Sequence, residues 1–339
     1  MYKKTISIII TISFIFATFT NIEAKNSLNS ISKPKFSQKT ITINGNENFT
    51  TDNGVTSGNG TAENPYIIEN IRFNFGLKNF FKDTYGIKII NTNSHLILRN
   101  CTFKFLNGFL LFYTYFRMLN KTSCGIYLNN VSNIRVENCK IKGFHQSIEL
   151  NNKSNNNNIY GCKCLKSFCG IGILDFSNYN TVENCKTYTY GCAICIYENS
   201  HYNTIKNCTT RRSAMNLVHN SSNNQIIGCR CTNRMGKGLN IYENANNNTI
   251  KNCFFKNNKI GIYIESGSVN NNLIENNFAY NRQHAVDKGK NNWNNETTGN
   301  YWNNYRDVDE NQDGIWDNPY NITGGENIDN HPLVKPVCG

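Results

Sequence analysis

Four residues that could take part in acid–base chemistry occupy one position of a repeated pattern. Asp175, Glu198, His219 and Glu243 each lie four residues after the first aliphatic or apolar residue of their repeat. Glycoside hydrolysis requires two carboxyl groups, about 5 Å apart in retaining enzymes and roughly 6.5 to 9.5 Å apart in inverting ones. Side chains from consecutive or alternate repeats would suit either distance. These four are our candidate catalytic residues, and the alternative is that they are solvated residues of exposed turns.

A second group of oxygen-bearing side chains has the spacing of a calcium-binding loop. Ligands at positions 1, 3, 5 and 9, and the backbone carbonyl at position 7, would come from Asp309, Asn311, Asp313, Asp317 and Ile315. Gly314 at position 6 allows the sharp turn of such a loop. Position 12 departs from the pattern, because Tyr320 stands where an EF-hand has glutamate. We expect calcium here, and the alternative is a metal-free loop of Asx turns.

Aromatic residues supply candidate ligand contacts at two places. Residues 103–118 are rich in Phe, Tyr and Leu, and Phe112, Tyr113 and Tyr115 could stack on a sugar or touch a membrane. The alternative is that this segment packs against the outside of the fold. Tyr197 and Tyr242 mark a further face on which a ligand could bind.

These residues belong to a repeat that runs from Gly86 to Asn277. Each repeat has a small residue, an Ile-x-Ile or Ile-x-Leu pattern, a turn rich in Asn and Ser, and an aliphatic residue three positions before its last residue. That last residue falls at Cys101, Cys139, Cys162, Cys185, Cys208, Cys229, Cys253 and Asn277, with gaps of 23, 23, 23, 21, 24 and 24 residues from Cys139 onward. A period of about 20 to 50 residues indicates a solenoid, propeller or array, and period-two alternation indicates strands.

One repeat has room for three short strands and three turns, which is one coil of a right-handed, single-stranded parallel β-helix. Coils stacked at about 4.8 Å place equivalent residues over one another, so inward aliphatic residues form continuous stacks. Ile205, for example, should be buried between Val182 and Ile226. Asn suits the turns because it tolerates left-handed backbone and can bond to the Asn of the next coil. The sequence predicts an all-β solenoid of 21–24-residue coils.

The chain contains 14 cysteines. In an exported protein an even number suggests disulfides. Seven of them, however, occupy one inward position of the stack, where a free thiol acts as a small apolar group. Equivalent residues of neighbouring coils have parallel Cα–Cβ vectors, which would strain a bridge between them. We therefore expect the seven cysteines from Cys101 to Cys253 to be reduced and buried.

The order of segments predicts export. Residues 1–24 begin with Lys3 and Lys4, continue with an apolar stretch too short to span a membrane comfortably, and end at Ala24, as a cleaved secretory signal does. A retained anchor is the alternative. Residues 25–290 would form the β-helix, with an aromatic insertion at 103–118, and residues 291–339 a cap that holds the calcium loop. The mature protein, without a transmembrane segment, should be secreted or lie at the cell surface.

Composition also restricts the partners. A net charge of +12 permits attraction to anionic glycans or lipid headgroups, but the Lys and Arg residues are scattered over turns. The sequence has no basic helix, zinc finger or RNA-binding signature, so we expect no nucleic-acid partner.

Several short motifs resemble one known family. They are Gly54-Val55, Gly58-x-Gly60-Thr61, Asn64 to Ile68, Gly299 to Trp302, Asp309 to Tyr320, and Asp329-Asn330-x-Pro332-Leu333. They are similar to the first and last segments of archaeal secreted proteins with right-handed β-helices like that of NosD, the periplasmic copper-binding protein. The resemblance covers nearly the whole mature chain. It implies a surface or carbohydrate-binding protein, a sugar hydrolase, or a copper-handling protein.

Three functional hypotheses follow. The first is an exported, non-catalytic β-helix that binds carbohydrate or another glycan of the cell envelope. The second is a polysaccharide lyase or glycoside hydrolase that uses the line from Asp175 to Glu243. The third is a copper-handling protein, which we do not expect because the six His residues are dispersed and only four Met residues are present.

Overall fold

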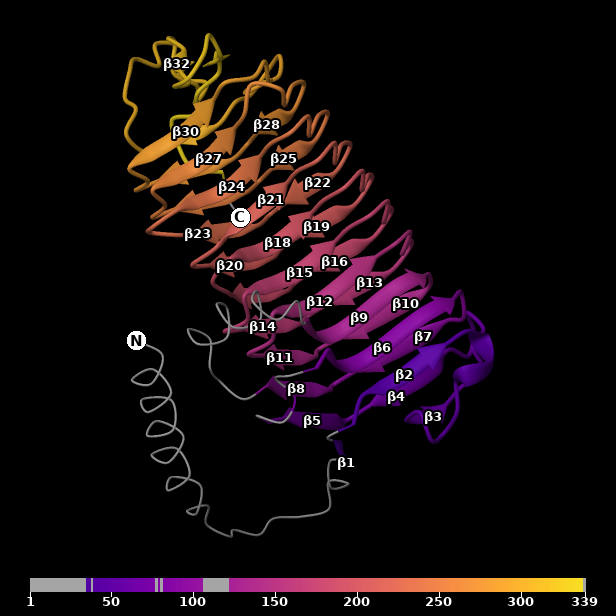
Figure 1. The fold of residues 1–339 in the computed structure, drawn as a ribbon. Helices are drawn as coiled ribbons and strands as arrows, with labels where there is room; N and C mark the ends of the chain where they lie inside the picture. Colours follow the sequence, from indigo (N-terminus) through magenta and orange to yellow (C-terminus); the bar gives the residue numbers. More distant parts are fainter. Residues whose placement is uncertain (1–34, 38, 77–78, 80–81, 106–121, 338–339) are drawn as a thin grey trace, which may run out of the picture. The chain divides into compact units, whose positions relative to one another are not determined.

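The structure, a computed structural model, describes residues 35–37, 39–76, 79, 82–105 and 122–337. These residues form coils of short β-strands stacked in chain order, from indigo to yellow in Figure 1. Each coil contributes strands to three sheets, which we name A, B and C, with 11, 10 and 10 strands in the described residues. Except for one hairpin at the N-terminal end, neighbouring strands of these sheets are parallel. The predicted right-handed parallel β-helix is therefore confirmed.

A coil passes from sheet B to sheet C to sheet A and then begins the next coil. The strands of sheet B are β2 (Ile41–Asn44), β6 (Thr84–Thr92), β9 (Ser123–Val131), β12 (Gln146–Asn151), β15 (Cys169–Ile173), β18 (Cys192–Ile196), β21 (Ala214–Leu217), β24 (Lys237–Ile241), β27 (Ile260–Ile264) and β30 (Gln283–Asp287). Those of sheet C are β3 (Val55–Ser57), β4 (Tyr66–Glu69), β7 (Leu96–Arg99), β10 (Ile134–Glu137), β13 (Asn158–Tyr160), β16 (Thr181–Glu183), β19 (Thr204–Lys206), β22 (Gln225–Ile227), β25 (Thr249–Lys251) and β28 (Asn272–Ile274).

Sheet A consists of β1 (Lys35–Ser37), β5 (Ile71–Phe75), β8 (Thr102–Phe105), β11 (Lys140–Lys142), β14 (Lys163–Leu165), β17 (Lys186–Tyr188), β20 (Thr209–Arg211), β23 (Arg230–Thr232), β26 (Phe254–Lys256), β29 (Asn277–Ala279) and β31 (Tyr301–Trp302). A separate hairpin near the C-terminus pairs β32 (Tyr320–Asn321) with β33 (Ile328–Asp329), and the short 3-10 helix η1 spans Asn46–Asn48.

The inward aliphatic positions form the stacks that the repeat predicts. Ile205 pairs with Val182 on one side and with Ile226 on the other, and all three are fully buried. In sheet B the corresponding stack includes Ile171, Ile194 and Met215, each also fully buried. Because every coil covers the apolar face of the one before it, the core is continuous along the stack.

The seven predicted cysteines lie in one buried row, and all seven are free thiols. Each thiol from Cys139 onward contacts a backbone carbonyl of the preceding coil; for Cys208 the carbonyl is that of Val182, at 3.5 Å. Asn276 continues the row, since its Nδ2 donates to the carbonyl of Ile250 at 2.9 Å. The thiol and the amide therefore fill the same place, the thiol as a weaker donor.

The predicted register is wrong by one residue in the last coil of the row. Phe254 pairs with Asn277, so Cys253 is matched by Asn276 rather than by Asn277. Likewise Ile250 pairs with Leu273, which is fully buried, rather than with Ile274. Two adjacent Asn residues and two adjacent aliphatic residues made both alignments acceptable in the sequence.

A second buried row consists of asparagines in the turns between sheets B and C. Its members are Asn157, Asn180, Asn203, Asn224, Asn248, Asn271 and Asn291. The Asn203 Oδ1 accepts hydrogen bonds from the backbone N–H and side-chain amide of Asn180, and its Nδ2 donates to the carbonyl of Ser177 at 3.0 Å. Buried backbone groups of every such turn are satisfied in this way, which is why the turn requires Asn.

Both rows end in a buried aspartate at the C-terminal cap. Asp287 accepts hydrogen bonds from Asn291 and from the indole N–H of Trp293, and Asp329 accepts them from Asn300 and from the indole of Trp302. Burial raises the pKa of Asp329 to about 6 and that of Asp287 above its usual value. Trp293 and Trp302 are themselves buried, as expected for residues that cover the last coil.

Some predicted segments fall partly or wholly outside the described residues. Residues 1–34, which contain the signal expected at 1–24, are among them. Of the aromatic insertion expected at 103–118, Phe103 and Phe105 belong to β8 and lie in the core, and the part from 106 onward is not described. No helix of the described residues has the length and apolar character needed to cross a membrane.

Candidate functional site

The turns that lead from sheet B to sheet C form a continuous surface feature, which we call the ridge. It consists of residues 91–95, 130–133, 152–157, 175–180, 198–203, 219–224 and 243–248. Left-handed residues recur in these turns, for example Asn91, Asn130 and Asn152, with φ near 50°. Asn adopts this conformation more easily than other side chains do, which explains its abundance here.

The structure brings the four candidate catalytic residues together on the ridge. Asp175, Glu198, His219 and Glu243 occupy equivalent left-handed positions, with φ of 52°, 54°, 52° and 51°. Backbone hydrogen bonds from the residue after each one to the next member of the line, 2.9–3.0 Å long, show that they stand on consecutive coils. The stacking that the sequence predicted is therefore present.

The side chains of this line are exposed or half-buried. His219 and Glu243 form an ion pair in which the side chains are 51% and 53% exposed. Glu198 is also exposed, and Asp175 is half-buried. Glycosidases distinguish their acid from their base by placing the carboxyls in different environments, usually with one desolvated. Asp175 is the most buried of the four, none is fully desolvated, and all of them could form hydrogen bonds with a ligand.

Three aromatic residues that the sequence analysis did not select lie beside this line. Phe176, Tyr179 and Tyr202 are 48%, 58% and 52% exposed, and their φ values are 58°, 58° and 57°. At the position of Tyr179 and Tyr202 the other coils have Asn156, Asn223, Asn247 and Asn270. A bulky residue is rare in left-handed backbone, and the conformation costs of the order of 1 kcal/mol or more. The sequence signal that could have located these residues is an aromatic residue at a turn position where other coils have asparagine.

The rings of Tyr179 and Tyr202 stack on consecutive coils. Their centroids are 5.2 Å apart, and the ring planes differ by 5°. The His201 ring lies 6.2 Å from that of Tyr202. The pair thus presents a rigid aromatic surface to solvent in the middle of the ridge.

A hollow of about 400 Å³ lies on the same ridge, one coil toward the N-terminus. Its lining is nearly all polar and consists of Asn46, Asn91, Thr92, Asn93, Asn130, Val131, Ser132, Lys153, Asn155 and Asn156. The backbone N–H of Lys153 donates to the Asp175 carbonyl at 2.9 Å, and that of Asn156 donates to the Asn178 carbonyl at 3.2 Å. The hollow therefore adjoins the coil that carries Phe176 and Tyr179.

Tyr197 and Tyr242 lie on the outer face of sheet B, next to the ridge. The Tyr197 ring is 6.0 Å from that of His219. The Lys237 ammonium lies 3.0 Å from the Tyr242 hydroxyl and 3.6 Å from the centre of the Tyr263 ring, and burial raises the pKa of Tyr242 to about 12. This face could extend a ligand contact from the ridge. The other aromatic candidates, Phe112, Tyr113 and Tyr115, are outside the described residues.

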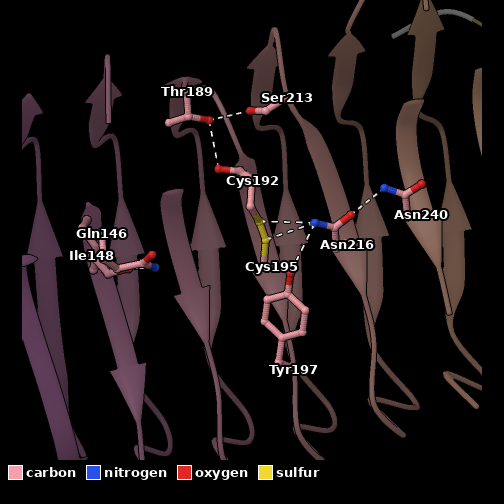
Figure 2. Close-up of a disulfide and its surroundings, with 9 residues drawn as sticks. All are labelled: Gln146, Ile148, Thr189, Cys192, Cys195, Tyr197, Ser213, Asn216 and Asn240. Atoms are coloured by element: carbon pink, nitrogen blue, oxygen red, sulfur yellow. Dashed lines mark hydrogen bonds between the residues drawn. A yellow bond between two sulfur atoms is a disulfide. The ribbon is translucent and has the colours of Figure 1, made fainter. Parts of the chain in front are cut away.

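The same face of sheet B carries a disulfide between Cys192 and Cys195 (Figure 2). Residues three apart on a regular strand point to opposite faces, but β18 is irregular between these two cysteines where it pairs with β21. Ile194 and Ile196 still point into the core. The Asn216 amide lies 3.4 Å from both sulfur atoms and accepts a hydrogen bond from Asn240 at 2.7 Å. The spacing in the sequence shows the unequal coil lengths, 23 and then 21 residues, but does not show that they bring these two cysteines together.

We predict that the row cysteines resist alkylation in the folded protein, because their thiols are buried in the core. After denaturation without reductant they should alkylate freely. The Cys192–Cys195 peptide should remain linked until a reductant is added. Peptide mass spectrometry of alkylated samples measures both results, and row cysteines bridged to one another would contradict the prediction.

The side chains of the proposed calcium loop accept hydrogen bonds from the backbone of the same loop. Asp309 accepts hydrogen bonds from the backbone N–H groups of Asp313 at 3.1 Å and of Gly314 at 3.2 Å, and Asp313 accepts one from Ile315 at 2.9 Å. Asp317 accepts one from the N–H of Glu310 at 3.1 Å. Across the described ranges, no three His, Cys, Asp or Glu side chains are arranged to hold a metal ion. This is the Asx-turn arrangement named as the alternative, and calcium binding stays a prediction.

If calcium does bind to this loop, it should stabilise the C-terminal cap. Asp309, Asp313 and Asp317 repel one another, and a divalent cation would relieve the repulsion. A ligand bound only to the folded state adds about 2.7 kcal/mol at a hundredfold excess over Kd, and without a glutamate at position 12 we expect a Kd of ~0.1 to 1 mM. Chelation should then lower the Tm of the wild type but not that of Asp313→Ala. An identical Tm with millimolar calcium and with chelator, and no heat of binding, would show that the loop is only a turn.

Comparison with known proteins gives one family and several similar folds. Residues 114–307 match the model of a family described as periplasmic copper-binding protein (NosD). No curated protein matches the chain. Among solved structures, pectate lyase Pel9A has a TM-score of 0.51 at 13% identity, over 83% of this chain and 70% of the lyase.

Two further structures have lower scores. The periplasmic alginate epimerase AlgG has a TM-score of 0.42 at 13% identity, over 74% of this chain and 68% of its own. The A-module of mannuronan C-5 epimerase AlgE6 from Azotobacter vinelandii has a TM-score of 0.46 at 15% identity, over 66% of this chain and 68% of its own. The likeness to Pel9A shows the β-helix fold alone.

Proposed function

The chain belongs to the family of the periplasmic copper-binding protein NosD, and on this premise we propose that it is an exported β-helix protein that binds carbohydrate on its ridge without catalysing a reaction. The family and the fold do not specify a ligand, so the proposal rests on the ridge itself.

The stacked, exposed pair of Tyr179 and Tyr202 is the observation that carries the proposal. Two consecutive coils hold tyrosine in left-handed turns where other coils hold asparagine, although Asn would be less strained there. Such strain at an exposed aromatic residue is typical of a binding position, because folding alone gains nothing from it. Aromatic rings offer a flat, rigid surface on which the C–H face of a sugar ring can pack.

The surroundings of the tyrosines supply polar contacts for sugar hydroxyls. The hollow adds the amides of Asn130, Asn155 and Asn156 on one side. The line of Asp175, Glu198, His219 and Glu243 adds acceptors along the same ridge. Because the coils repeat at about 4.8 Å, a ligand running along the ridge would meet a new turn roughly every 5 Å, which suits an extended chain.

Replacement of the tyrosines by asparagine tests this proposal. Tyr179→Asn and Tyr202→Asn restore the residue type of the neighbouring coils, so we expect them to fold at least as stably as the wild type. Binding to glycans identified on an array should fall about tenfold or more for each, which corresponds to about 1.4 kcal/mol. Calorimetry of the strongest array ligand gives the affinities.

Tyr280→Asn is the matched control. Tyr280 is 67% exposed and also left-handed, with φ of 55°, but it follows β29 in sheet A and is not part of the ridge. Its replacement should leave binding unchanged. Equal losses in all three variants, or no loss in the ridge variants, would refute binding on the ridge.

Product analysis separates this proposal from a lyase or hydrolase. A non-catalytic protein releases no reducing ends and no unsaturated sugars from the polysaccharides it binds. If such products formed, and if Glu198→Gln or Glu243→Gln abolished them, the line of candidate catalytic residues would be an active site after all.

The described residues do not fit a copper ion, which the name of the family implies. Their His, Cys, Asp and Glu side chains provide no group of three arranged around a metal. His219 is paired with Glu243, and Cys192 and Cys195 are joined to each other. We therefore assign no copper chemistry to these residues. Uptake of Cu(I) by the purified protein in competition with a chelator would contradict this assignment.

A further inference from the structure

We infer that the hollow on the ridge takes an uncharged sugar that carries an acetamido group, such as an N-acetylhexosamine, and that the acids beside it disfavour a chain of uronates along the ridge. This inference rests on the proposed carbohydrate binding and names the class of sugar. Three features of the described residues carry it: an interrupted row of surface amides, the charges near the tyrosines, and the place where the two meet.

Side-chain amides on the N-terminal coils of the ridge form a hydrogen-bonded row on the surface. The Asn91 Nδ2 donates to the Asn44 Oδ1 at 3.1 Å, and the Asn130 Nδ2 donates to the Asn91 Oδ1 at 3.0 Å. A neighbouring bond has the opposite direction, since the Asn46 Nδ2 donates to the Asn93 Oδ1 of the following coil at 3.0 Å. In the row from Asn44 to Asn130, each hydrogen bond is donated to the preceding coil. The Oδ1 of each residue can therefore accept a hydrogen bond from the coil that follows.

This row stops at Asn130, in the lining of the hollow. The equivalent residue of the next coil is Asn152, but its amide donates to the Asn129 Oδ1, at 3.3 Å, instead of to Asn130. Within the described residues no donor reaches the Asn130 Oδ1, and Asn156, which also lines the hollow, makes no side-chain hydrogen bond. A residue with an open carbonyl-type acceptor and a residue with an open amide thus both line a space of about 400 Å³.

An acetamido group has the complementary pair of functions. Its N–H could donate to the Asn130 Oδ1 and so continue the amide row by one member, and its C=O could accept from the Asn156 amide. An acetamido group holds its N–H donor and its C=O acceptor on opposite sides of one rigid plane, whereas in a sugar hydroxyl both functions share a single oxygen. Asn130 and Asn156 are exposed, so water can pair with them when no ligand is bound, and we expect a preference for the acetamido group of about tenfold rather than an absolute one.

Negative charge near the tyrosines disfavours acidic sugars at that part of the ridge. Asp175 immediately precedes Phe176, and Glu198 lies on the next coil, four residues before Tyr202. Neither carboxylate forms an ion pair with another described residue. Lys153 is the single charged residue in the lining of the hollow. A chain of uronates along the ridge would bring several carboxylates toward these two acids, and each such approach is unfavourable.

Calorimetry with four matched tetrasaccharides tests the inference. The ligands are tetramers of N-acetylglucosamine, glucose, glucosamine and galacturonate, compared at one pH and one salt concentration. We expect the N-acetylglucosamine tetramer to bind at least tenfold more tightly than each of the others. If the acids alone attracted the ligand, the cationic glucosamine tetramer would bind best, and its affinity would fall steeply with added salt. That result would overturn the inference.

Asn130→Gly removes the proposed amide contact without backbone strain, since glycine adopts a φ of 53° readily. It should weaken binding of the N-acetylglucosamine tetramer about tenfold and that of the glucose tetramer less than twofold. Asn184→Gly is the matched control, because Asn184 is exposed and left-handed, with φ of 53°, but lies between β16 and β17, outside the ridge. Equal effects of the two variants would overturn the role of Asn130.

The two proposals fail in different ways. If galacturonate binds most tightly and Tyr202→Asn weakens its binding, carbohydrate binding on the ridge stands and the acetamido inference is wrong. If Tyr202→Asn has no effect on any tetramer that binds, both are wrong. If none of the four binds, the acetamido inference is wrong, and the glycan array decides the proposed function. Tyr202→Asn should reduce the affinity for the acetylated and the unsubstituted tetramers by the same factor, because stacking does not depend on the substituent.

Discussion

Ile205→Asp should abolish cooperative folding of the β-helix. Ile205 is fully buried between Val182 and Ile226, in the middle of the stack of sheet C. An aspartate there has no partner for its carboxylate, and its burial without one costs at least 4–5 kcal/mol, about the whole stability of a marginal domain. In a solenoid the damage is not confined to one coil, since each coil is covered by the next.

Lys206→Asp is the control for this change. Lys206 is the next residue of β19 and is exposed, so the same carboxylate would stay in water. Thermal unfolding followed by circular dichroism should show a shift of a few degrees at most for Lys206→Asp and no cooperative transition for Ile205→Asp. A variant Ile205→Asp that melts within a degree or two of the wild type would refute the register of the core.

Asn203→Leu should cost about 3–5 kcal/mol, the second largest effect that we expect. Leucine has the branched shape of asparagine but bulkier methyl groups, so overpacking adds to the loss of hydrogen bonds. It leaves the backbone N–H and the amide of Asn180 without their acceptor, and the carbonyl of Ser177 without its donor. All of these groups are buried, so water cannot replace the lost partner.

Asn178→Ala provides the comparison within the same region. Asn178 is half-buried, and its Oδ1 accepts one hydrogen bond, from the His201 N–H. Its loss should cost about 1 kcal/mol. Urea denaturation of both variants gives the free energies of unfolding, and a smaller loss for Asn203→Leu than for Asn178→Ala would show that the buried asparagine row is not a main source of stability.

The ridge illustrates how far the sequence could locate a site. Spacing alone placed Asp175, Glu198, His219 and Glu243 on one line, because equal coil lengths bring equivalent residues together. It did not show that these side chains are exposed, nor that Tyr179 and Tyr202 stack beside them. Exposure depends on the direction of the turn, and the direction depends on backbone angles that the residue types alone do not specify.

The last coil and the disulfide show a similar limit. A shift by one residue, from Asn277 to Asn276, was undecided in the sequence because either residue fits the pattern, and the hydrogen bond to Ile250 decides it. The Cys192–Cys195 bridge depends on the irregularity of β18 against β21, which arises from a difference in the length of two neighbouring coils. Such differences change which side chains meet without changing the fold.

The sequence by itself determined the coil, the three strands in each coil, the inward aliphatic stacks and the buried row of thiols. All of these follow from periodicity, because a solenoid superimposes residues that recur at a constant interval. The tertiary structure alone decided the pairing of cysteines, the final register, the role of Asp329 as the buried end of a row, and the hollow beside the aromatic turns. These depend on contacts between residues that break the period, and the interval carries no information about the geometry of such exceptions.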